Sequence, residues 1–388
     1  MSGLRRLDPI GPELLRLDAA TLIAELGGPT LARLPGVGDG GPRGVIVLQH
    51  GDERTGLDAL LAVLRDAAPL PYDLHVLFGN VEAAIEPPGF AHRMLPHQAD
   101  MNRAWFAPGE QGGGHDSVSI ATREALVHLR ALPLRALVDL HNTTGENPFH
   151  AIVATHDPLD VGLAALFTPL IVRWDQRMHT VLEALRGHCV AATIECGRVG
   201  NPAALPFAVD GLRRFLAAPE PDALPVPDDT RVLSRMRRVI IDPGATLAFG
   251  GRDREDPRLA ADVVVAEGVE LRNGIEQRPG WLLATVRPGF ERSVRVIDID
   301  GSDVTDGLLA FERGEVRVAQ RTTPLMMTRS VAATRADCLT YLLDRAELTE
   351  VPADPGTDPD ATSQAATSSP ANRSSSGTLV ATSDHSSS

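Results

Sequence analysis

Short apolar runs, rich in β-branched residues, alternate with stripes of apolar residues at helical spacing over residues 44–197. The first run, Val45 to Gln49, is followed by leucines at intervals of three and four residues, at positions 57, 60, 61 and 64. Further runs lie at 74–78, 136–140 and 190–194, and helical patterns at 119–130 and 181–187. Strands that alternate with helices predict a layered α/β fold, with a mixed sheet flanked by helices.

Polar side chains stand where three of these runs stop, namely His50, His141 and Glu195. In open α/β sheets, ligands bind beyond the carboxyl ends of the strands. The sequence therefore predicts that these three side chains, far apart in the chain, meet at one functional site.

The composition and the apolar pattern of the sequence change after residue 218. Residues 219–229 are rich in Pro and Asp, and short strand-like runs follow at 263–265, 281–286, 294–299 and 316–318, with a helix expected near 332–348. Beyond residue 352 almost nothing apolar remains. We expect a catalytic domain at 1–218, a small β-rich domain at 230–348 and a disordered tail at 352–388.

Composition excludes several classes of function. All 37 basic residues are Arg, so there is no lysine for a pyridoxal Schiff base or for a phosphate-binding loop. The net charge of -14 argues against nucleic-acid and anionic-membrane partners. Three cysteines without a pairing or metal-ligand pattern indicate a reduced, cytoplasmic setting. The sequence has no secretory h-region and no run of about 18 apolar residues, so we expect neither secretion by this route nor a membrane span. Homo-oligomerisation is left open.

A metal site is the first chemical hypothesis. His50 and Glu53 lie three residues apart on a tight loop after a strand, and His141 can arrive from a neighbouring strand. Two His and one carboxylate, with a fourth position for water, are a common catalytic zinc set. Asp139 is expected to orient His141 from behind. By itself a His-x-x-Glu pattern is weak, because most histidines are ordinary surface or core residues.

Two further groups supply candidate chemistry. Arg93, Asn102 and Arg103 belong to a loop-like stretch whose guanidinium groups suit a carboxylate, although a solvated loop is the alternative interpretation. Glu195 ends an apolar strand, where burial would raise its pKa toward that of a general base, and a salt-bridged Glu is the alternative. The neighbouring Cys196 has no partner base and is interpreted as a small buried residue.

Taken in order, four motifs resemble the succinylglutamate desuccinylase and aspartoacylase family, a branch of the zinc carboxypeptidase fold. They are His50-Gly-Asp-Glu53, Arg93 with Asp100-Met-Asn102-Arg103, Asp139-Leu-His141-Asn-Thr-Thr, and Ile194-Glu195-Cys-Gly197. The resemblance implies one Zn²⁺ per chain on His50, Glu53 and His141. It further implies Glu195 as general base, Arg93 as the group that polarises the scissile carbonyl, and Asn102 and Arg103 as receptors of the α-carboxylate.

The predicted function is therefore zinc-dependent hydrolysis of the amide bond of a small N-acyl amino acid. The alternatives are a zinc carboxypeptidase acting on short peptides and a non-catalytic binding protein of the same fold. The family's substrate-binding tyrosines have no counterpart in a matching motif, since the chain has only Tyr72 and Tyr341. Arg177 or Arg186 could receive a second carboxylate on the acyl group, so the acyl specificity stays open.

Overall fold

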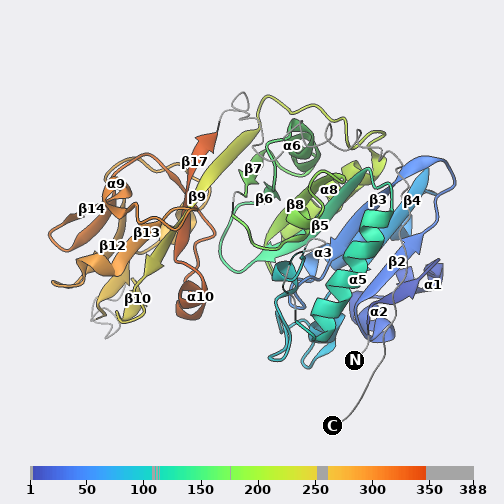
Figure 1. Cartoon of the computed structure of the whole chain (residues 1–388), viewed down its shortest axis with the longest axis horizontal. Coiled ribbons are helices and arrows are strands. Elements are labelled where there is room, and N and C mark those ends of the chain that lie inside the picture. Colours follow the sequence, from blue (N-terminus) through green and yellow to red (C-terminus); the bar gives the residue numbers. More distant parts are fainter. Residues whose placement is uncertain are drawn as a thin grey trace, which may run out of the picture. The chain divides into compact units, whose positions relative to one another are not determined.

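A twelve-stranded mixed sheet forms the centre of the structure, a computed structural model that describes residues 3–106, 110, 112, 114–174, 176–250 and 261–346. Its strand order is β1-β2-β4-β3-β5-β8-β6-β7-β9-β17-β16, with β13 paired to β9 (Figure 1). The strands of the first part of the chain are β1 (Arg5–Leu7), β2 (Thr30–Leu34), β3 (Gly40–Val47), β4 (Tyr72–Phe78), β5 (Ala136–Thr143), β6 (His150–Val153), β7 (Leu170–Arg173) and β8 (Val190–Arg198). The later strands of this sheet are β9 (Arg231–Ile241), β13 (Val294–Ile297), β16 (Thr323–Leu325) and β17 (Thr340–Ala346).

The three strands that carry or precede the predicted site residues, β3, β5 and β8, run parallel with β4 in the middle of this sheet. Strand β3 pairs in parallel with β4 and β5, and β5 pairs in parallel with β8. Val45 and Val47 belong to one buried core, whereas Ile46 belongs to a second. Because successive side chains of a strand point to opposite faces, both faces of β3 are covered, which explains its continuous apolar run.

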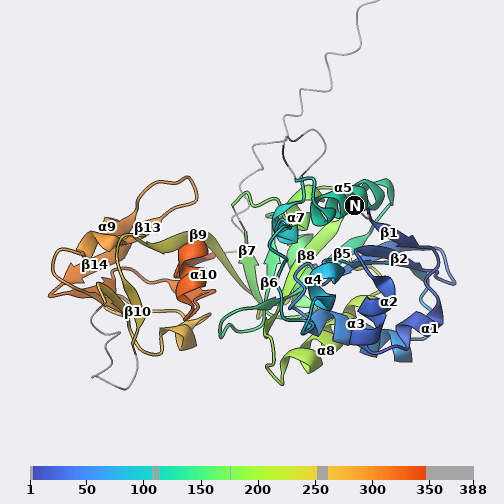
Figure 2. The ribbon, with the colours of Figure 1, turned by 90° about the horizontal axis from the view of Figure 1, so that it is seen from below.

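Helices cover both faces of the sheet. Figure 2 shows α5 (Ser117–Ala131) and α7 (Val181–Ala184) on one side of β5 and β8, and α2 (Ala19–Leu26), α3 (Thr55–Asp66) and α8 (Ala204–Ala217) on the other. The remaining helices of this part are α1 (Pro12–Leu15), α4 (Val81–Ile85), α6 (Pro158–Ala165) and the 3-10 turn η1 (Met101–Arg103). Sequence and structure thus agree on a mixed α/β sheet flanked by helices. None of the helices in the described ranges is both long and apolar enough to cross a membrane.

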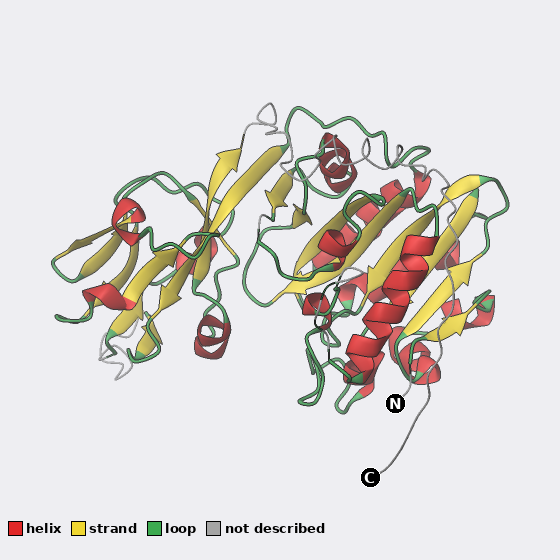
Figure 3. Ribbon diagram, viewed as in Figure 1, coloured by secondary structure: helices red, strands yellow, loops and turns green. Residues whose placement is uncertain are grey.

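The C-terminal part is built mainly of strands (Figure 3). A five-stranded sheet has the order β10 (Leu247–Phe249), β11 (Val263–Val265), β12 (Leu282–Val286), β15 (Glu315–Val318) and β14 (Leu309–Glu312). Short helical segments accompany it, namely η3 (Val269–Arg272), η4 (Glu291–Ser293), α9 (Thr305–Leu308) and α10 (Val331–Ala336). The smaller β-rich part predicted from the sequence is therefore present.

Strand β9 belongs to both parts. Its beginning pairs with β7 on one side, its end pairs with β13, and β17 pairs with it from Val232 to Val239. Leu233 and Met236 lie in a core of the first part, whereas Val239 and Ile241 lie in the core of the second. Residues Met1–Glu350 accordingly form one compact unit, and the predicted tail at 352–388 lies outside the described residues.

Three expectations about single elements need correction. The helix expected at 332–348 is wrong beyond Ala336, because Thr340–Ala346 is strand β17, whose buried residues pair with β9. Strands β5 and β8 also continue past their predicted ends, so that His141 and Glu195 lie within strands. The apolar pattern stopped at these residues, but the backbone pairing between β5 and β8 did not.

Candidate metal and amide-hydrolysis site

His50 and Glu53 project from the loop between β3 and α3. Leu48 has a φ of 59°, which is unusual for a residue other than glycine and turns the chain out of the strand. A Cβ atom at Gly51 would lie 2.5 Å from the backbone N of Ala84, so only glycine fits there. The tight loop brings His50 Nδ1 to 2.6 Å from Glu53 Oε1.

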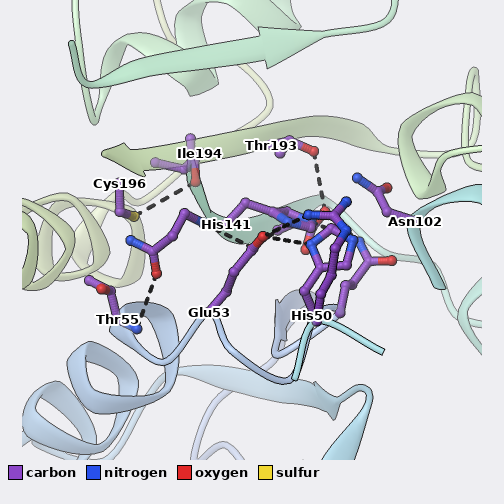
Figure 4. Close-up of polar contacts among 12 residues, drawn as sticks. His50, Glu53, Thr55, Asn102, His141, Thr193, Ile194 and Cys196 are labelled. Carbon is purple, nitrogen blue, oxygen red and sulfur yellow. Dashed lines mark hydrogen bonds and ion pairs between the residues drawn. The ribbon is translucent and has the colours of Figure 1, made fainter. Parts of the chain in front are cut away.

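His141 completes the cluster from the adjacent strand β5. Leu140 is in register with Val47, so His141 lies just beyond the last residue of β3. Its Nδ1 atom is 2.7 Å from Glu53 Oε2. Ligand atoms of His50, Glu53 and His141 all lie within 4.8 Å of one another, and all three residues are buried. Figure 4 shows the three side chains turned toward one another.

A carboxylate stands behind each histidine. His50 Nε2 is 3.0 Å from Asp100 Oδ1, and His141 Nε2 is 3.0 Å from Asp139 Oδ2. Metal-binding histidines usually donate their second ring N–H to a carboxylate or carbonyl, which fixes the tautomer and turns the free lone pair to the metal. Gln49 also donates to Asp139, at 2.6 Å.

The hydrogen bonds of the two histidine rings indicate whether a metal ion fits these residues. Without a cation, hydrogen bonds from both Nδ1 atoms to Glu53 and from both Nε2 atoms to Asp100 and Asp139 would require two buried imidazolium rings. A divalent cation held by the two Nδ1 lone pairs and Glu53 satisfies the same groups with neutral rings. His₂Glu is also a ligand set that zinc adopts in hydrolases. The residues present therefore fit a zinc ion.

The pKa directions of Glu53 and His141 show that the cluster favours positive charge. Burial alone would raise the pKa of Glu53, but His50 and His141 hold it well below its ordinary value. Burial alone would lower the pKa of His141, yet the carboxylates of Asp139 and Glu53 raise it well above its ordinary value. The carboxylates around the two rings thus favour a positive charge beside Glu53, which is the charge that a divalent cation would supply.

Glu195 lies on β8 directly beside His141. The two residues are in register between β5 and β8. Its side chain lines the cavity described below, while its Oε2 atom is shielded and has no hydrogen-bond partner. Burial raises the pKa of Glu195 to about 7, which suits a group that exchanges a proton near neutral pH.

Arg93, Asn102 and Arg103 line the same cavity. Arg93 donates to Asp100 Oδ2 at 3.1 Å and approaches Glu53 Oε1 at 3.4 Å. Arg103 donates to the backbone carbonyl of Asn102 at 2.7 Å, while the buried Oδ1 atom of Asn102 has no partner. The seven residues predicted as metal ligands, general base and substrate-binding groups therefore line one cavity.

The cavity has a volume of about 550 Å³ and is lined by both parts of the chain. The cluster, Glu195, Arg93 and Arg103 form its polar end. The other walls include Trp174 after β7, Met178 and Leu182 near α7, and residues 326–341 of the C-terminal part. This volume suits a small molecule, since ligand pockets usually measure about 300–1,000 Å³.

Comparison with known proteins identifies the fold. No family model and no curated protein sequence matches the chain. Among solved structures, a succinylglutamate desuccinylase/aspartoacylase from Rhodobacter sphaeroides superposes with a TM-score of 0.54 at 16% identity, over 82% of this chain and 89% of that one. The succinylglutamate desuccinylase from Chromobacterium violaceum gives 0.53 at 15% identity, over 82% and 89%. This chain has the succinylglutamate desuccinylase/aspartoacylase fold.

A third solved structure of that fold is the product-bound ectoine utilization protein EutE (DoeB) from Ruegeria pomeroyi. It superposes with a TM-score of 0.51 at 18% identity, over 81% of this chain and 88% of that one. At identities of 15–18%, these three likenesses concern the fold.

Several site residues were missed or left without a role by the sequence analysis. Asp100 belongs to a motif that resembles the desuccinylase/aspartoacylase family, but the sequence does not predict its contact with His50. The backbone N of Asn142 donates to Glu53 Oε2 at 3.0 Å, a contact that no side-chain pattern reveals. Tyr341 lines the cavity, whereas the hydroxyl of Tyr72 donates to the Leu216 carbonyl, away from the site.

The two arginines considered for a second carboxylate do not line this cavity. Arg177 is paired with Glu110 in a separate pocket, and Arg186, in that same pocket, donates to the carbonyl of Ala154. Neither side chain is placed to receive a group held at the His50, Glu53 and His141 cluster.

Proposed function

We propose that this chain is a zinc-dependent amidohydrolase that hydrolyses the amide bond of a small N-acyl amino acid. The observation that carries the proposal is the buried cluster of His50, Glu53 and His141 beside Glu195, at the polar end of one cavity. His50 and His141, through Nδ1, and Glu53 would hold one Zn²⁺ per chain. A bound zinc ion supplies Lewis acidity to the scissile carbonyl and lowers the pKa of the attacking water.

The chain's own residues would carry the proton and orient the substrate. Glu195 accepts a proton from the water that attacks the carbonyl carbon. As the C–N bond breaks, Glu195 returns that proton to the leaving amine, and the products are a carboxylate and a free amino acid. Arg93 donates to the carbonyl oxygen as negative charge develops on it. Asn102 and Arg103 bind the α-carboxylate, since a guanidinium fork matches a carboxylate.

A small substrate is favoured over a peptide. Met326, Thr328 and Tyr341 of the C-terminal part form one wall of the cavity, which restricts room for a longer chain. The solved structures that share the fold include succinylglutamate desuccinylases. Digestion of short peptides at a rate above that of every N-acyl amino acid would favour the carboxypeptidase alternative.

The test combines metal content with activity. The purified chain, loaded with zinc, is assayed against formyl, acetyl and succinyl amino acids with amine release as the readout. We expect close to one zinc per chain. We also expect Glu195→Gln to keep zinc and lose about 10²–10⁴-fold in kcat, and His141→Ala to lose the metal. Glu312→Gln, on an exposed residue of β14, is the matched control. Wild-type activity in the Glu195 or His141 variant would refute the proposal, as would zinc that cannot be loaded.

A further inference from the structure

One part of the cavity lining, the apolar wall, is formed by large side chains without charge. Six side chains from β6, the β7–α7 region, α7, the end of β16 and β17 contribute to it: Ile152, Trp174, Met178, Leu182, Met326 and Tyr341. Trp174 and Tyr341 pack against each other with ring centroids 5.9 Å apart. A wall with this composition gains free energy by burying an apolar group, and it gains little from a charged one.

Charged groups near this wall are already engaged or have the wrong sign for an anion. Among the described lining residues, the guanidinium groups are Arg93, which faces Glu53 and Asp100, and Arg103, whose charge also acts on the Tyr341 hydroxyl. Asp337 lies beside the wall, where it accepts a hydrogen bond from the Tyr341 hydroxyl at 2.9 Å and faces Arg238 at 3.8 Å. With Arg93 assigned to the scissile carbonyl and Arg103 to the α-carboxylate, a second carboxylate on the substrate would meet Asp337 and no further lining guanidinium.

Trp174 supplies the one unpartnered polar atom of this wall. The residue is 8% exposed, and its Nε1 atom has no hydrogen-bond partner. One indole N–H satisfies a single acceptor lone pair. A buried carboxylate needs a cation or several donors to offset its loss of hydration, and this shielded atom supplies neither.

We infer that the wall binds the side chain of the amino-acid half of the substrate, and that this side chain is uncharged and largely apolar. The inference rests on the proposed function, and it narrows the substrate class to N-acyl derivatives of amino acids such as methionine or leucine. The charge of Arg103 acts on the Tyr341 hydroxyl, so an amino acid whose α-carboxylate is held by Arg103 would lie beside the wall. N-acyl aspartate and glutamate are disfavoured.

The experiment compares N-acyl methionine and leucine with N-acyl aspartate, glutamate and lysine, all carrying the acyl group that gives the fastest release. We expect kcat/KM for the apolar substrates to exceed that for the charged ones at least tenfold. Calorimetric titration with free L-methionine and L-aspartate supplies a readout independent of turnover, and we expect methionine to bind at least tenfold more tightly.

A variant that adds a cation to the wall sharpens the test. Met178→Arg should raise the ratio of acidic to apolar kcat/KM at least tenfold, whereas Val127→Arg, at an exposed position of α5, should leave it unchanged. Hydrolysis of charged substrates as fast as apolar ones, or tighter binding of aspartate, overturns the inference and leaves the proposed function standing. Methionine binding without hydrolysis of any N-acyl amino acid would contradict the proposed function. It would still support the inference that the wall binds an apolar side chain.

Discussion

Glu53 is the residue at which the contacts of the site converge. Its two carboxylate oxygens face His50, His141, Arg93 and the backbone N of Asn142, at 2.6 to 3.4 Å. Behind this first layer, Asp100 and Asp139 hold the outer nitrogens of the two rings. The side chains of the candidate ligands are thus held in place by residues outside the cluster of His50, Glu53 and His141.

Asp139→Asn should weaken zinc binding by about 10–100-fold, because the outer carboxylate orients His141 and increases the basicity of its free nitrogen. Competition with a chromophoric zinc chelator measures the affinity directly. Asp210→Asn, which changes an exposed partner of Arg214 on α8, is the control and should bind zinc like the wild type. Unchanged affinity in the Asp139 variant would mean that the ring is held in place without it.

His150 should make folding stability depend on pH. Its Nδ1 atom is 2.9 Å from the carbonyl of Pro148, its Nε2 atom is buried without a partner, and burial lowers its pKa from 6.5 to about 4. The unfolded chain therefore takes up a proton at higher pH than the folded chain does. Stability contributed by the neutral ring is present above pH 6.5 and is lost as the pH falls toward 4, by about 3 kcal/mol.

Urea unfolding of His150→Asn at several pH values checks this prediction. Asn retains a donor near the position of Nδ1 and does not titrate, so the loss of stability between pH 6.5 and 4 should be smaller by about 3 kcal/mol than in the wild type. Release of metal at low pH affects both proteins and cancels in the comparison. His97→Asn, at an exposed position, should keep the wild-type slope. An identical slope in the His150 variant would contradict the assignment.

At the scale of elements, the sequence predicted best where one strand is buried on both faces. The apolar runs predicted as strands at 45–49, 74–78, 136–140 and 190–194 overlap with β3, β4, β5 and β8. Strands β9 and β17 escaped prediction, because their pairing joins residues about 100 positions apart and no local pattern records it. The same limit applies to Asp100, whose contact with His50 spans a loop without periodicity.

Arg43 on β3 binds the C-terminal end of α8 through contacts that the sequence does not predict. Its guanidinium donates to the carbonyls of Phe215 and Ala218 and lies 3.9 Å from the centroid of the Tyr72 ring. These carbonyls end α8, where helix C-termini lack partners and favour a cation. The side chain is 2% exposed, so water cannot replace it.

Arg43→Met should therefore destabilise the protein by about 3 kcal/mol, because buried carbonyls lose charged donors while the packing volume is largely kept. Denaturant unfolding measures the change. Arg135→Met, which removes an exposed pair with Asp222, should cost less than about 1 kcal/mol. Equal effects of the two substitutions would show that Arg43 contributes no more than a surface ion pair.

At the scale of the whole molecule, the site depends on chain segments that the sequence assigns to different domains. The metal cluster lies on strands β3 and β5 and their loops, whereas Met326 and Tyr341 come from the C-terminal part. Strand β9 carries residues of both cores, so the predicted boundary at 219–229 precedes a strand that continues the main sheet beyond β7. The predicted domains at 1–218 and 230–348 are therefore proposals that a truncation can test.

A chain ending at residue 218 should fail to unfold cooperatively, because it loses β9 and leaves β7 as an unpaired edge. It also loses Leu233 and Met236 from the core and Tyr341 from the cavity wall. A chain ending at Glu350 keeps the compact unit, and its melting temperature should stay within about 2 °C of the full chain. Circular dichroism melts with zinc analysis compare the two. Cooperative melting and zinc binding by the shorter chain would show that the catalytic part folds alone and that β9 is dispensable to it.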